Sequence, residues 1–190
     1  PLEIENIVET IVEISFYLLL IIAHLGIFDV LYFHNYKCQL NARPECQREV
    51  FWHIWRHLIY AFQFFWVANF RFHGFALVFL GILYFFDIFV AWADVLEENK
   101  SRAAQGGLPR GEYFMHVVLS LLVGGYLLSI FQAVWADRNL TTEIVYAPPE
   151  VPFVLRIYMI AMGIIALGNF VYDFYKWLNF QPQPEIEANL

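Results

Sequence analysis

The sequence predicts an all-α protein that crosses a membrane five times, with four helices forming an antiparallel bundle around a site of histidines and carboxylates. The first observation is composition: the 190 residues are 60% hydrophobic and 19% aromatic but only 15% charged. A soluble domain keeps about a quarter of its residues charged and cannot bury this much apolar side chain. The net charge of −7, without a basic run, argues against a nucleic-acid partner.

The second observation is a set of five apolar stretches, each near the length of about 20 residues that a helix needs to cross the hydrocarbon. They cover residues 14–33, 50–70, 74–93, 114–135 and 153–174. Short connections make consecutive helices antiparallel. We therefore expect a single transmembrane domain over residues 1–180 and a polar tail over 181–190. Acidic residues precede the first stretch, which indicates a retained span and not a signal peptide.

The connections also predict an orientation. The first and third loops share one membrane side, here called side X, while the N-terminus, the short link 71–73 and the Pro-rich segment 147–149 lie on side Y. Lys and Arg near the helix ends number eight on side X and three on side Y. The excess predicts that side X is cytosolic, with the N-terminus outside and the C-terminus in the cytosol. Cys38 and Cys46, in the first loop, are then expected to be reduced.

The third observation is where the ionisable residues of the spans fall. They gather in the half of each helix nearest side X, so that five of the six histidines share one layer with at least four carboxylates. Such residues are costly in hydrocarbon and usually face the bundle interior at functional sites. His24 and Asp29, five residues apart, point about 140° away from each other on a helix, so at most one is expected to face the cluster.

Four-residue spacings support convergence of these side chains. Glu49, His53 and His57 form one stripe on the second helix, and Glu112 and His116 repeat the spacing on the fourth. Imidazoles and carboxylates from facing helices bind divalent iron, manganese or zinc, and a four-helix bundle can supply two metals. We expect a divalent metal, with iron preferred and two ions possible. The predicted ligands are His53, His57, Glu112 and His116, followed by Glu49, Asp87, Asp94 and His24.

The segment His53-Ile-Trp-Arg-His57 resembles one H-x-x-x-H element of the histidine-box membrane hydroxylases and desaturases. The resemblance covers five residues, and the H-x-x-H-H boxes of that family are absent from this sequence. It implies dioxygen activation for hydroxylation or desaturation of a lipid-like substrate near the cytosolic face. Metal-assisted hydrolysis is the second possibility among enzymes.

Two other classes of function stay open. One is a b-type haem electron-transfer subunit with His24 and His57 as axial ligands. The other is a non-catalytic accessory subunit of a larger membrane complex, in which the polar residues only solvate helix ends. The expected partners are membrane lipids, a hydrophobic small molecule, and a second copy or a larger complex. The small-residue stripe Gly125, Ser129 and Ala133 is expected to pack on the fifth span or on that second copy.

Overall fold

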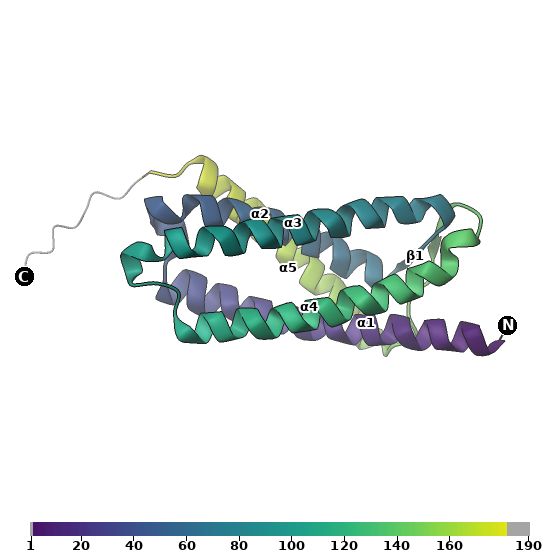
Figure 1. Cartoon of the computed structure of the whole chain (residues 1–190). Helices are drawn as coiled ribbons and strands as arrows, with labels where there is room; N and C mark the ends of the chain where they lie inside the picture. Colours follow the sequence, from purple (N-terminus) through teal and green to yellow (C-terminus); the bar gives the residue numbers. More distant parts are fainter. Residues whose placement is uncertain (1, 182–190) are drawn as a thin grey trace, which may run out of the picture.

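The computed structural model describes residues 2–181, which form an all-helical chain with five long helices. These are α1 (Leu2–Phe28), α2 (Gln47–Val67), α3 (Leu77–Ser101), α4 (Arg110–Ala136) and α5 (Phe153–Leu178). A π-helical segment, η1 (Asp29–Lys37), continues α1. The first turns of α1 and the last turn of α5 lie at opposite ends of the bundle (Figure 1). The predicted polar tail lies outside the described residues from position 182 onward.

Four helical segments are long and apolar enough to cross a membrane within the described part of the chain. They are Asn6–Lys37, Gly74–Ser101, Arg110–Asn139 and Phe153–Leu178. At most 28% of the apolar window of each segment is buried in the protein. Most of their surface is therefore available to lipid, as expected for a multi-pass membrane protein. α2 occupies the position of the second predicted span and is less apolar, because it carries His53, Arg56, His57 and Gln63.

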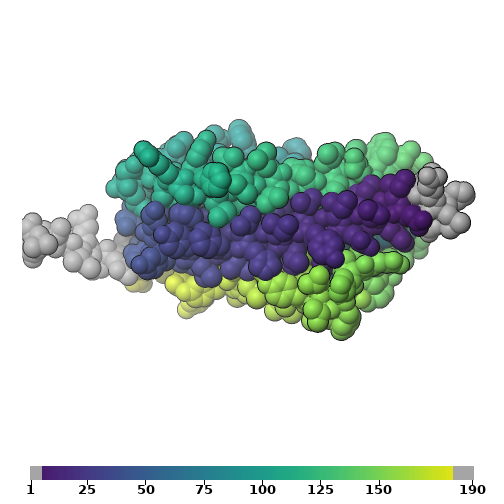
Figure 2. Space-filling view, turned by 90° about the horizontal axis from the view of Figure 1, so that it is seen from below, coloured from purple at the N-terminus to yellow at the C-terminus, as the bar shows by residue number. Residues whose placement is uncertain are grey.

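The helices pack in two groups. α1 packs along α4, whereas α2 packs on both α3 and α5. Seen from below, α1 is flanked by α4 on one side and by α5 on the other (Figure 2). Apolar side chains from both groups meet in one core, which includes Phe16, Leu19, Phe64, Tyr126 and Met159. A smaller apolar cluster closes the side X end, where Cys38 and Cys46 are buried free thiols.

The small-residue stripe of α4 packs on α1 and not on α5. Ser15 Oγ donates to Ser129 Oγ at 2.9 Å, and a Cβ added at Gly125 would lie 3.8 Å from Leu18 of α1. The expected contact with the fifth helix is therefore wrong. The first and fourth helices are neighbours because the chain places α2 and α3 together on the opposite side of the bundle.

The side Y end is closed by a strand pair that the sequence did not reveal. Strand β1 (Phe70–His73) lies where the short link 71–73 was expected, and it pairs antiparallel with β2 (Glu143–Tyr146), with Phe70 opposite Tyr146. Both strands are rich in aromatic or β-branched residues. Gly74 follows β1 with φ of 55°, and any Cβ there would lie 2.5 Å from Leu140 O, so this turn requires glycine.

Candidate functional site

Polar side chains converge at the side X end of the bundle, between the two helix groups. We call this set the polar cluster; its members are Asp29, His34, Glu49, His53, Asp94, Glu98, Arg102, Glu112 and His116. They come from η1 and from helices α2, α3 and α4, with Arg102 directly after α3. All except His116 are buried. The cluster therefore joins four segments that are distant in sequence.

One group of possible metal ligands lies between η1 and α4. It consists of Asp29, His34, Glu112 and His116, and one ligand atom of each lies within 4.8 Å of the others. His34 Nε2 is 3.3 Å from Asp29 Oδ2 and 3.4 Å from Glu112 Oε1. His116 Nε2 is 3.3 Å from the same Asp29 oxygen, and its Nδ1 is 3.0 Å from Glu98 Oε1. Two imidazoles thus share one carboxylate.

A second group overlaps the first at His34. It consists of His34, Glu49 and His53, with ligand atoms again within 4.8 Å of one another. The rings of His34 and His53 are stacked, with centroids 4.4 Å apart and planes at 14°. His53 Nε2 lies 3.1 Å from Asp94 Oδ1, and Arg56 Nη1 donates to the other Asp94 oxygen at 3.0 Å. Because the two groups share His34, together they contain three imidazoles and three carboxylates.

Arg102 connects the carboxylates of the two groups. It is fully buried, and its guanidinium donates to Glu49 Oε2 at 3.0 Å and to Glu112 Oε1 at 2.6 Å. The Ser101 hydroxyl also donates to Glu49. Burial alone would lower the pKa of Arg102, but Glu49 and Glu112 more than offset it, and the pKa is raised. The loop after α3 therefore fixes the carboxylates of α2 and α4.

The π-helical geometry of η1 explains how His34 enters the cluster. Asp29 and His34 are five residues apart, a separation that puts them on different faces of an α-helix. A π-helix bonds residue i to residue i+5, so this separation brings them onto one face. His34 was not among the predicted ligands, although it belongs to the polar layer. Apolar periodicity carries no signal for the change from α- to π-helix.

The predicted ligands divide into two sets. The structure brings five of them into the polar cluster: His53, Glu112, His116, Glu49 and Asp94. His57 lies beside it, with Nδ1 3.3 Å from Asp173 Oδ2. Asp87 and His24 lie apart from the cluster. Asp87 accepts a bond from Gln63 Nε2 at 2.9 Å. His24 is exposed, with Nδ1 2.7 Å from Leu20 O and Nε2 2.8 Å from the Tyr158 hydroxyl.

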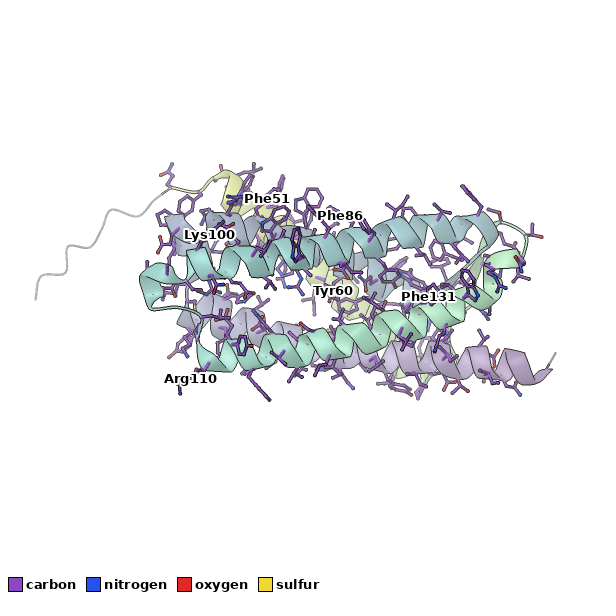
Figure 3. The ribbon with its side chains drawn as sticks, in the orientation of Figure 1. Phe51, Tyr60, Phe86, Lys100, Arg110 and Phe131 are labelled. Atoms are coloured by element: carbon purple, nitrogen blue, oxygen red, sulfur yellow. The ribbon has the colours of Figure 1, made fainter. Side chains whose placement is uncertain are left out.

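A cavity of about 340 Å³ adjoins the cluster. Its polar end is lined by Asp29, His34, His53, Glu98 and His116. From there it continues between the helix groups along apolar side chains, among them Ile22, Ala23, Phe64, Leu119, Val123, Met162 and Ala166. Tyr60 lines the same cavity and is visible between the ribbons of α3 and α4 (Figure 3). The volume lies within the range of small-molecule sites, about 300–1,000 Å³.

Comparisons of the chain with protein-family models, curated proteins and solved structures give no match. Function must therefore be argued from the chemistry of the site. With neutral imidazoles, the five carboxylates of the cluster and the two guanidinium groups of Arg56 and Arg102 add up to a net charge of −3. Such a site, shielded from water, can be stabilised by cations or by protonation of the imidazoles.

Proposed function

We propose that the protein is a five-span membrane metalloenzyme, an oxidoreductase that holds divalent iron in the polar cluster and acts on a hydrophobic substrate. The main supporting observation is that two groups of possible metal ligands adjoin one largely apolar cavity. Within each group, the ligand atoms lie within 4.8 Å of one another. Metal donors and an apolar binding space are the two parts that such an enzyme needs.

The properties of α2 support a fifth span. Its 21 residues extend about 31 Å, close to the thickness of the hydrocarbon core. Its polar residues do not oppose this, because Glu49, His53 and Gln63 are buried inside the bundle. With five crossings, the excess of Lys and Arg on side X favours an outside N-terminus and a cytosolic C-terminus.

The donor set supports a metal. One or two divalent ions would offset the three uncompensated negative charges of the cluster, and mixed imidazole and carboxylate donors suit iron, manganese or zinc. The position of His34 supports it as well: its Nε2 lies 3.3 Å from Asp29 Oδ2 and 3.4 Å from Glu112 Oε1, so one imidazole and two carboxylates approach a common point.

Bound iron would supply dioxygen activation for hydroxylation or desaturation. The protein's own contribution is orientation, since carboxylate oxygens of Glu98 and Asp94 lie 3.0 and 3.1 Å from ring nitrogens of His116 and His53. Such partners fix the ring and raise the basicity of the ligating nitrogen. The apolar walls of the cavity exclude water from the substrate side of the cluster.

The haem alternative has less support. His24, one of its two axial ligands, has both ring nitrogens within hydrogen-bond distance of Leu20 O and the Tyr158 hydroxyl. Carboxylates close to His57 would also repel haem propionates.

The accessory-subunit alternative is favoured by the ion pairs themselves, because a protonated His116 would bond Asp29 and Glu98 without metal.

Elemental analysis of the purified protein tests the proposal. We expect bound iron near two equivalents, with a large loss in His53→Ala and in His116→Ala. His24→Ala is the matched control, because this histidine is exposed and lies outside the cluster, and its iron content should equal that of the wild type. Unchanged metal in all variants would overturn the ligand assignment, and a Soret absorption band would favour haem.

A further inference from the structure

The cavity has a polarity gradient along the bundle axis. At its side X end stand the imidazoles and carboxylates of the polar cluster. Val123 follows His116 by seven residues on α4, and Ile22 of α1 precedes Asp29 by seven residues. Both steps lead along the bundle away from side X. Each step of seven residues extends about 10 Å along a helix. The apolar end of the cavity therefore lies toward the middle of the bundle, where the hydrocarbon of the bilayer is deepest.

The wall of the cavity is continuous with the surface that faces lipid. Leu31, Val95 and Ile165 line it, and these residues are 61%, 53% and 49% exposed. Val95 belongs to α3 and Ser120, which also lines the cavity and is exposed, belongs to α4. These two helices pack on different partners, α3 on α2 and α4 on α1. We therefore expect a molecule dissolved in the bilayer to reach the cavity between these two helices.

Uncharged polar groups also line the cavity, Asn35 next to His34 at the cluster end and Tyr60 seven residues beyond His53 toward the middle of the bundle. Asn35, Asn169 and Tyr60 line the cavity together with the histidines. Amide and phenol groups hydrogen-bond a hydroxyl or a carbonyl well. Arg56, the cationic residue of the wall, is already bonded to Asp94 at 3.0 Å. The polar end therefore suits an oxygen-bearing head without charge better than a carboxylate or a phosphate.

Gly26 leaves room in the wall of the cavity. It lines the space, and a Cβ built on it would meet no atom within 4 Å. Its φ is not in the left-handed region, so its backbone does not require glycine. A larger side chain at this position can therefore be built beside the cavity without displacing the helix.

From the gradient, the lateral opening and the open space at Gly26, we propose that the cavity binds a single-chain amphiphile drawn from the bilayer. Its uncharged, oxygen-bearing head lies at the polar cluster and its hydrocarbon tail runs toward Val123 and Met162. This orientation matches that of a lipid in the leaflet on side X. As a substrate assignment it rests on the proposed function, and it predicts reaction near the head of the chain and not at the tail.

Photolabelling of the full chain in lipid nanodiscs tests the proposal. Two probes are used, long-chain fatty alcohols with a diazirine either at the tail end or beside the hydroxyl. The tail probe should mark peptides that contain Val123 and Met162, and the head probe should mark those near Asn35 and His116. Labelling of all four positions should be lost in Gly26→Leu. The matched control is Gly81→Leu, a helical glycine that also has no atom within 4 Å but does not line the cavity.

Equal labelling of the wild type and Gly26→Leu would overturn the proposal, as would marks reversed between the two probes. A fatty acid with the tail diazirine forms a further arm, and stronger labelling by the acid than by the alcohol would overturn the uncharged head. Metal content of the same samples separates this proposal from the proposed function. Gly26→Leu should keep its iron while it loses labelling, whereas labelling without iron in any sample would support the amphiphile site and reject the metalloenzyme.

Discussion

Arg102 makes the most completely buried charge interaction at the polar cluster. Its guanidinium lies between Glu49 and Glu112, at 2.8 and 2.6 Å for the closest atom pairs, and is fully buried. Arg102→Leu would leave both carboxylates without their cation. Removal of one partner of a buried ion pair lowers the free energy of unfolding by about 3–5 kcal/mol. We expect a loss of this size in unfolding measured in detergent.

Arg48→Leu provides the control for that substitution. Arg48 pairs with Glu97 at 3.7 Å, but its side chain is 71% exposed. Exposed pairs contribute about 0–1 kcal/mol, because water and salt screen them. Equal losses of unfolding free energy in the two variants would show that the buried ion pairs of Arg102 stabilise the fold no more than an exposed pair does.

Cys46 provides a pH-dependent readout outside the spans. Burial, assisted by Glu49, raises the pKa of this thiol from 9.0 to about 11. Because alkylation requires the thiolate, native Cys46 should resist iodoacetamide near neutral pH and react once the protein is unfolded. The raised pKa also favours the folded state at lower pH, a contribution lost as the pH rises through about 9 to 11. Rapid alkylation of folded protein near neutral pH would contradict this environment.

The sequence predicted the residue types of the polar cluster better than its membership. His53, Glu49, Glu112 and His116 could be predicted, because four-residue spacing on ordinary α-helices keeps such side chains on one face. His34 could not, because its position depends on the π-helix. Arg102 was also missed as a member, because it lies in a loop, where basic residues are usually solvated.

At the scale of elements, the crossing of α2 and α5 depends on Gly163. A Cβ added there would lie 3.3 Å from Ala61 O and 3.4 Å from Phe64 Cβ, so the helix backbones are too close for a larger residue. Gly163→Leu should push the helices apart and lower the free energy of unfolding by about 1–3 kcal/mol, as overpacked sites do. Thermal unfolding in detergent measures this.

Gly168→Leu on the same helix is the matched control. No atom lies within 4 Å of a Cβ at that position, and leucine is a better helix former than glycine by roughly 0.5–1 kcal/mol. We expect no loss of stability in this variant. A loss as large as that of Gly163→Leu would mean that helix propensity or detergent contact, and not the approach to α2, determines the result.

The sequence predicted the elements that have their own hydropathy pattern, and it did not predict the strand pair, which has none. Long apolar runs identified α1, α3, α4 and α5, although the helices continue beyond the predicted bounds, because polar residues at the helix ends carry no hydropathy signal. The pairing of β1 with β2 was missed because the partners are about 70 residues apart in the sequence and each is only four residues long. Strand pairing at that separation leaves no local periodicity.

At the scale of the whole molecule, the polar cluster and the cavity depend on both helix groups being held together. The strand pair β1·β2 joins the segments after α2 and after α4 at the side Y end, while Arg102 joins α2 and α4 at the side X end. Both ends are thus fastened, and the cavity lies between them. This arrangement requires α2 to run the length of the bundle between α3 and α5, which five crossings allow.

The proposed topology of five crossings predicts which loops share a membrane side. Single cysteines at Ala42 and Asn99, both exposed on side X, should react alike with an impermeant maleimide, and cysteines at Phe75 and Thr141, both exposed on side Y, should react alike. The native thiols are buried and should contribute little.

In intact cells of an expression host, Phe75→Cys and Thr141→Cys should be labelled, and Ala42→Cys and Asn99→Cys only after lysis, because basic loops stay in the cytosol. Labelling of Ala42→Cys together with Phe75→Cys would mean that α2 does not cross, and complete inversion of the pattern would reverse the orientation while keeping the five spans.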